Sequence, residues 1–122
     1  RIDPGTVMLD LDGDGDERTG WVILYLHMAA EGRVRLGDVV KQGENIGHPS
    51  CEGGSATGTH AHMARKYNGQ WIPAASSVLP FVMNGWIPVD GEAAYQGTLI
   101  RGNQVVRASV LSDSQSMIPA QN

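Results

Sequence analysis

The sequence predicts a mostly β domain built from antiparallel hairpins, and three observations support this. Sixteen glycines and six prolines in 122 residues indicate many turns and few long helices. Short segments rich in valine, isoleucine and aromatic residues alternate with glycine-rich or polar stretches, as strands and turns do. The dipeptides Asn68-Gly69 and Gly102-Asn103 each separate two such segments, and both are typical hairpin turns.

The first half of the chain predicts two hairpins joined by a glycine-rich stretch. Residues 5–11 (GTVMLDL) and 21–28 (WVILYLHM) predict two strands around an enlarged acidic tip. Between residues 32 and 47, glycines separate short β pieces at Val34, Val39, Val40 and Ile46. Residues 59–67 (THAHMARKY) and 70–74 (QWIPA) then form the second hairpin around Asn68-Gly69.

The last third of the chain predicts less regular structure and one more hairpin. The prolines within residues 76–91 leave room for a single helical turn at most. Residues 95–110 predict a hairpin around Gly102-Asn103. We expect one domain over residues 1–110, followed by a polar tail at 111–122.

Charge and hydrophobicity exclude some classes of partner. The net charge of −4 argues against nucleic acid or an anionic membrane as the main partner. No apolar run approaches the roughly 18–20 residues that a membrane span needs. The single cysteine, Cys51, forms no disulfide within the chain, so it is either a reduced loop thiol or a pairing point for a missing segment or a partner chain.

An alternating acidic run at the tip of the first hairpin suggests a calcium site. Its sequence matches the first half of a calcium-binding loop, D-x-D-x-D-G, in which oxygen ligands occupy positions one, three and five. The glutamate that completes such loops is replaced by Trp21, so a solvated hairpin tip remains the alternative. The candidate calcium ligands are Asp10, Asp12, Asp14 and Asp16.

The histidines give the strongest indication of chemistry. On a strand, His60 and His62 point to the same side of the sheet, as a metal site or an acid–base pair requires. His27 ends a predicted central strand, from which its side chain can reach the sheet face or stay in the core. His48, next to Pro49 in a loop, is expected to be an ordinary surface residue.

The order and spacing of these elements resemble the lysostaphin-type (LytM-like) zinc metalloendopeptidases. The matching elements, within residues 5–74, are Tyr25-x-His27, then Val34, Gly37, Val40, Gly43, Ile46 and Gly47, and finally GGSATGTHAH. The resemblance implies a two-layer antiparallel β-sandwich of the duplicated hybrid motif type. It also implies secretion to the bacterial cell envelope, and hydrolysis of peptide cross-links in peptidoglycan.

The resemblance also implies a role for each histidine. His62 corresponds to a zinc ligand, while His60 and His27 flank the metal as catalytic residues. The zinc would polarise the scissile carbonyl and lower the pKa of its bound water. The geometry implied is convergence of the His27 and His60 rings to within one water molecule.

The sequence departs from the family pattern upstream of the first strand. The family's other two zinc ligands, a histidine and an aspartate, belong there, but only RIDP precedes that strand and Asp3 is its single carboxylate. The start at Arg1 and the unpaired Cys51 favour a missing ligand-bearing part over its loss, and we expect the 122-residue chain alone to be inactive.

Two alternatives to a peptidase remain open. One is a non-catalytic LytM-like module that binds cell wall or regulates a partner hydrolase. The other is a calcium-stabilised structural β domain in which the two histidines of the HAH sequence have no role. Trp71, Trp86 and Tyr67 are expected either to line a substrate groove or, by preference, to pack in the core and at its rim.

Overall fold

The computed structural model describes residues 4–56, 58–111 and 114–119. The chain divides into two compact units, Arg1–Ile72 and Pro73–Asn122, and each is described by itself. The predicted domain over residues 1–110 includes the first unit and most of the second, and it stays a prediction. The part of the chain that carries the peptidase-like motifs, residues 5–74, nearly matches the first unit.

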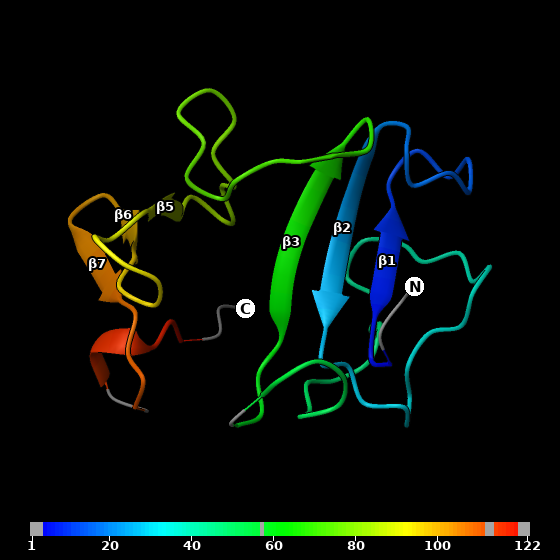
Figure 1. Ribbon diagram of the computed structural model, residues 1–122, viewed down its shortest axis with the longest axis horizontal. Helices are drawn as coiled ribbons and strands as arrows, with labels where there is room; N and C mark the ends of the chain where they lie inside the picture. Colours follow the sequence, from blue (N-terminus) through cyan, green and yellow to red (C-terminus); the bar gives the residue numbers. More distant parts are fainter. Residues whose placement is uncertain (1–3, 57, 112–113, 120–122) are drawn as a thin grey trace. The chain divides into compact units, whose positions relative to one another are not determined.

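The first unit contains a four-stranded antiparallel sheet in the order β1-β2-β3-β4. Figure 1 shows β1, β2 and β3 side by side. Its strands are β1 (Val7–Asp10), β2 (Trp21–Leu26), β3 (His62–Tyr67) and β4 (Gln70–Trp71). At the β3–β4 turn, Asn68 and Gly69 have φ angles of 49° and 79°, as a type I′ hairpin turn requires. Both hairpins predicted for this half of the chain are therefore confirmed.

Strand alternation divides the side chains of this sheet between two faces. On one face the Trp21 and Tyr67 rings lie 4.8 Å apart, and the guanidinium of Arg65 lies 5.4 Å from the Trp21 centroid. Burial lowers the pKa of Arg65 below its ordinary value. On the other face Val22 is almost fully buried, and Lys66 lies over the Trp71 ring. Both faces thus carry packed side chains on the two central strands.

The glycine-rich stretch between the two hairpins forms turns instead of the predicted short β pieces. No strand is assigned within residues 33–47, all of which the structure describes. Two tight turns interrupt this stretch, where the Asp38 N–H donates to the Arg35 carbonyl and the Glu44 N–H to the Lys41 carbonyl. Each turn contains a glycine, Gly37 or Gly43, with φ near +90°. The turns come too close together for a paired strand to form between them.

The second unit contains a three-stranded antiparallel sheet in the order β5-β6-β7. Its strands are β5 (Ile87–Val89), β6 (Thr98–Arg101) and β7 (Gln104–Arg107). The hairpin predicted around Gly102-Asn103 is confirmed as the β6–β7 connection. The 76–91 segment has no helical turn, and the one described helical element is the 3₁₀ helix η1 (Ser114–Ser116).

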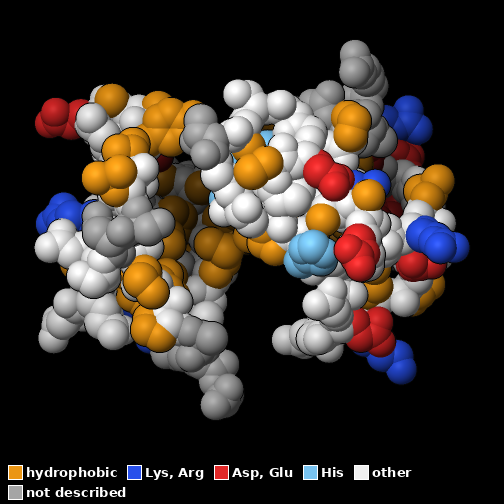
Figure 2. Space-filling view, turned by 90° about the horizontal axis from the view of Figure 1, so that it is seen from below, with side chains coloured by type: hydrophobic (Ala, Val, Ile, Leu, Met, Phe, Trp, Pro, Cys, Tyr) orange, Lys and Arg blue, Asp and Glu red, His pale blue; other side chains and the backbone are white. Residues whose placement is uncertain are grey.

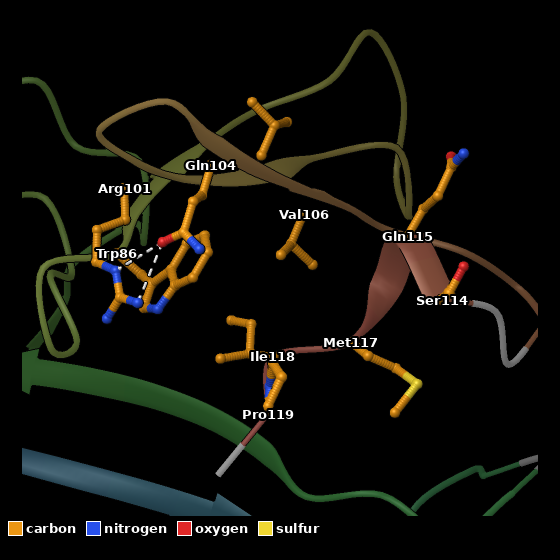
Figure 3. Close-up of a pocket in the computed structure, with 10 residues that line it drawn as sticks. Trp86, Arg101, Gln104, Val106, Ser114, Gln115, Met117, Ile118 and Pro119 are labelled. Atoms are coloured by element: carbon orange, nitrogen blue, oxygen red, sulfur yellow. Dashed lines mark hydrogen bonds between the residues drawn. The ribbon is translucent and has the colours of Figure 1, made fainter. Parts of the chain in front are cut away.

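A cavity of about 400 Å³ lies in the second unit (Figure 3). Arg101 lies over the buried Trp86 ring, 4.8 Å from its centroid, and accounts for one wall of the cavity. Met117 and Ile118, from the segment predicted to be a polar tail, line it as well. None of the described residues that line this cavity is a histidine or carries a carboxylate.

The buried core is small, and many large hydrophobic side chains remain at the surface (Figure 2). Leu36 and Val39 in the turn-rich stretch are almost fully exposed. Tyr67 and Trp71 are about half exposed, whereas Trp86 is buried. The prediction of a mostly β, antiparallel fold is confirmed. Within the described ranges, no helix has the length and hydrophobicity to cross a membrane.

Candidate functional site

His27 follows directly after β2 in a backbone conformation that is unusual for its residue type. Its φ is 66°, in the left-handed region, and its side chain is 4% exposed. A non-glycine residue in this region costs on the order of 1–3 kcal/mol and persists only where its surroundings fix it, and such residues cluster at functional sites. The contacts around His27 must therefore hold it in place.

The segment Pro49-Ser50 provides the main contacts to the backbone of His27. Strands β2 and β3 pair as far as Leu26 and His62, and beyond that point Pro49-Ser50 lies between the two chains. Pro49 bridges to Met28 on one side, and Ser50 bridges to His60 on the other. The Ser50 N–H and hydroxyl both donate to the His27 carbonyl, at 2.6 and 2.8 Å.

The His27 ring is fixed by two carbonyl oxygens of the next residues in this loop. Its Nδ1 lies 3.0 Å from the carbonyl oxygens of both Glu52 and Gly53. A carbonyl oxygen only accepts hydrogen bonds, so we assign the proton to Nδ1. In the neutral ring, Nε2 is then the unprotonated nitrogen. Gly54 lies against the edge of the His27 ring, since a Cβ on Gly54 would be 3.4 Å from His27 Cε1.

His60 and His62 approach His27 from the start of β3. The His27 and His60 ring centroids are 4.5 Å apart, and those of His27 and His62 are 6.4 Å apart. The His60 Nδ1 lies 2.8 Å from the Gly58 carbonyl, so this ring also carries its proton on Nδ1. The expected convergence of His27 and His60 is confirmed. Their catalytic roles and the role of His62 as a metal ligand stay predictions.

The residues described here do not complete a zinc site around these histidines. A zinc ion needs at least three protein ligands with converging donor atoms. Within the described ranges, the three imidazoles do not form such a group. Asp3, the one carboxylate before β1, lies outside the described residues. The thiol of Cys51 is exposed and lies 4.0 Å from the Thr59 hydroxyl.

The acidic tip of the β1–β2 hairpin brings three carboxylates together. Ligand oxygens of Asp10, Asp12 and Asp14 lie within 4.8 Å of one another, the one such group found in the described part of the chain. Asp16 lies outside this group because its carboxylate binds the Arg18 guanidinium at 2.9 Å. Exposed carboxylates cluster in this way without a metal too, so calcium stays a prediction.

Hydrogen bonds within the tip move the pKa values of these carboxyl groups in different directions. The Thr19 hydroxyl and the Asp16 N–H lower the pKa of Asp14, and Arg18 lowers the pKa of Asp16. The Asp14 N–H lowers the pKa of Asp12, but a hydrogen bond with Asp10 and desolvation outweigh it and raise this pKa above its ordinary value. Desolvation and the neighbouring carboxyl groups thus oppose the main-chain hydrogen bond at Asp12.

No protein-family model, no curated protein and no solved structure matches this chain. The resemblance to lysostaphin-type peptidases accordingly stands on the sequence motifs.

Sequence reasoning missed Ser50, Glu52 and Gly53, which hold the His27 ring and backbone. Glu52 and Gly53 act through main-chain carbonyls, which any residue type supplies. The paired glycines Gly53-Gly54 were the available signal, because adjacent glycines permit a close approach of backbone to another group.

Proposed function

We propose that this chain is part of a lysostaphin-type zinc metalloendopeptidase domain, a hydrolase of peptide cross-links in the bacterial cell envelope. The observation that supports this proposal is the packing of His27 against His60, with ring centroids 4.5 Å apart. Each ring donates its Nδ1 proton to a main-chain carbonyl. Two neighbouring imidazoles with defined tautomers are suited to proton transfer near neutral pH.

Burial and backbone strain add to this support. His27 is buried and has a left-handed backbone, whereas an incidental surface histidine would need neither feature. His60 and His62 are exposed, so the site opens to solvent on the β3 side. A peptide substrate would reach the His27 ring from that side. In this proposal His27 and His60 exchange protons with the reacting groups, and His62 is a zinc ligand.

A second function is favoured by the incomplete ligand set. The described residues supply one of the three ligands that the family uses, and one histidine does not retain zinc. A non-catalytic LytM-like module, which binds cell wall or regulates a partner hydrolase, needs no metal. In that case the ring contacts of His27 would serve the stability of the loop 48–54.

Metal analysis distinguishes the two functions. Zinc content is measured by elemental analysis in the 122-residue chain and in a longer product that includes upstream sequence of the gene. The peptidase proposal expects about one zinc per chain in the longer product only, and its loss in H62A. H48A is the matched control, because His48 contacts Ala29 through its main-chain carbonyl and the side chain is not assigned to the site.

Hydrolysis of purified peptidoglycan is the second measurement. We expect the longer product to release free amino groups from peptidoglycan, and H27A and H60A to lose at least about 100-fold in rate, the usual contribution of a general acid or base. If the longer product binds no zinc and releases no free amino groups from peptidoglycan, the catalytic proposal fails. Retained binding of that product to insoluble peptidoglycan would then support the non-catalytic module.

A further inference from the structure

The hydroxyl of Ser50 joins the backbone of His27 to the loop that holds the His27 ring. It donates to the His27 carbonyl at 2.8 Å and accepts the Glu52 N–H at 3.0 Å. Because both bonds use one oxygen, this side chain links Glu52 directly to the His27 carbonyl, which also accepts the Ser50 N–H. The Glu52 and Gly53 carbonyls that follow lie 3.0 Å from Nδ1.

We propose that Ser50 is a positioning residue that sets the tautomer of His27, an inference that rests on the proposed function. With Ser50 in place, two carbonyl oxygens face Nδ1 and the proton resides there. Nε2 is then the basic nitrogen of the neutral ring, whose centroid lies 4.5 Å from that of the His60 ring. Without the hydroxyl, the turn over residues 50–52 loses its side-chain hydrogen bond, and the two carbonyls are held less firmly within reach of Nδ1.

The tautomer matters because only one nitrogen of a neutral imidazole accepts a proton. If Nε2 carried the hydrogen, the basic nitrogen would be Nδ1, which faces the carbonyl oxygens of Glu52 and Gly53. Proteins commonly orient a histidine that uses one ring nitrogen for proton transfer or metal binding by giving the other ring nitrogen a carbonyl partner. Ser50 would therefore act on the reaction through His27 without contacting the substrate.

Nitrogen-15 NMR of the 122-residue chain, without metal or substrate, tests this inference. Long-range proton–nitrogen correlations identify which ring nitrogen of His27 is protonated, and H27A assigns the signals. We expect the Nδ1–H form in the wild-type chain. In S50A we expect the ratio of the two tautomers to change about five-fold toward Nε2–H, as the loss of one hydrogen bond implies. S50T, which retains the hydroxyl, should restore the wild-type ratio.

Ser109 provides a matched control, since its hydroxyl accepts the Leu111 N–H at 3.0 Å in a turn of the second unit. S109A should leave the His27 signals unchanged. An Nε2–H form in the wild-type chain overturns the inference, whether or not S50A folds. An unchanged tautomer ratio in folded S50A overturns it as well.

These measurements are independent of the proposed function. If the longer gene product has no peptidase activity but S50A shifts the tautomer, the peptidase proposal alone fails. If the longer product is active, S50A should lower kcat about ten-fold and leave KM unchanged, with rescue by S50T. An active enzyme whose kcat is insensitive to S50A would refute the role of Ser50 alone.

Discussion

The substitution G53A tests how closely the loop beneath His27 is packed. A Cβ on Gly53 would overlap the Pro4 carbonyl oxygen, and Gly53 has a φ of 69°. The left-handed backbone costs alanine about 1 kcal/mol. Moving a main-chain carbonyl to relieve the overlap costs about another 2 kcal/mol. We therefore expect G53A to lower the free energy of unfolding of the first unit by about 3 kcal/mol.

Gly13 offers a control that separates the two contributions. Its φ is 70°, nearly equal to that of Gly53, and no atom lies within 4 Å of the position of a Cβ. G13A should thus lose about 1 kcal/mol, from the backbone alone. With an m value of about 1–2 kcal/mol per M urea, the midpoints of the two variants should differ by about 1–2 M.

Unfolding in urea is best followed through the amide signals of β2, which report on the first unit. Movement of the Pro4 carbonyl away from the new Cβ would also displace Gly5, whose carbonyl accepts the Met28 N–H at 2.9 Å next to His27. The signals of the His27 ring should therefore shift in G53A and stay in place in G13A. Equal urea midpoints for the two variants would refute the close packing of Gly53 against Pro4.

Three further predictions concern the turns and the acidic tip. N68A should lower the free energy of unfolding by about 1–2 kcal/mol, measured by urea denaturation. It removes the Asn68 Oδ1 that accepts the Gly20 N–H at 2.8 Å. N103A, at the other hairpin, is the control. Because the pKa values of Asp14 and Asp16 are lowered, these groups stabilise the tip at pH values above about 3.9, the aspartate pKa in the unfolded chain. The amide shifts of residues 14–19 should therefore change as the pH falls below about 3.9. The raised pKa of Asp12 has the opposite effect on the pH dependence of stability. R18A should weaken the pH-dependent shift changes that come from Asp16, and those from the other carboxyl groups should stay the same. If Asp10, Asp12 and Asp14 bind calcium, millimolar Ca²⁺ should raise the melting temperature and D12N/D14N should abolish the increase; no shift in the wild-type chain would exclude the site.

Local sequence signals predicted the hairpins because each depends on a short stretch of chain. Asn68-Gly69 and Gly102-Asn103 set the turn geometry, and alternating apolar residues set the strands on either side. The stretch 33–47 was not predicted correctly. Its valines and isoleucine have the composition of strands, and the Val34 N–H does donate to the Ile46 carbonyl. The turns at Gly37 and Gly43 leave no run long enough for a strand, and composition alone does not reveal this.

The candidate site was predictable only in part for a related reason. The HAH spacing and the position of His27 at a strand end indicated that the rings would meet if the strands paired in the right register. The register pairs Leu26 with His62, which places His27 and His60 just beyond the last pair on each strand. The insertion of Pro49-Ser50 between the two chains has no comparable signal, since it depends on a contact between loops.

The register also explains why the histidine cluster and the insertion belong together. Had β2 and β3 continued to pair past Leu26 and His62, His27 would have lain in an ordinary extended conformation beside the backbone of β3. Instead the chains separate, Ser50 binds the His27 carbonyl, and the φ of 66° turns the ring toward the loop carbonyls and His60. The strain at His27 and the contacts of Ser50 are therefore two parts of one arrangement. A variant that relaxes one of them should disturb the other.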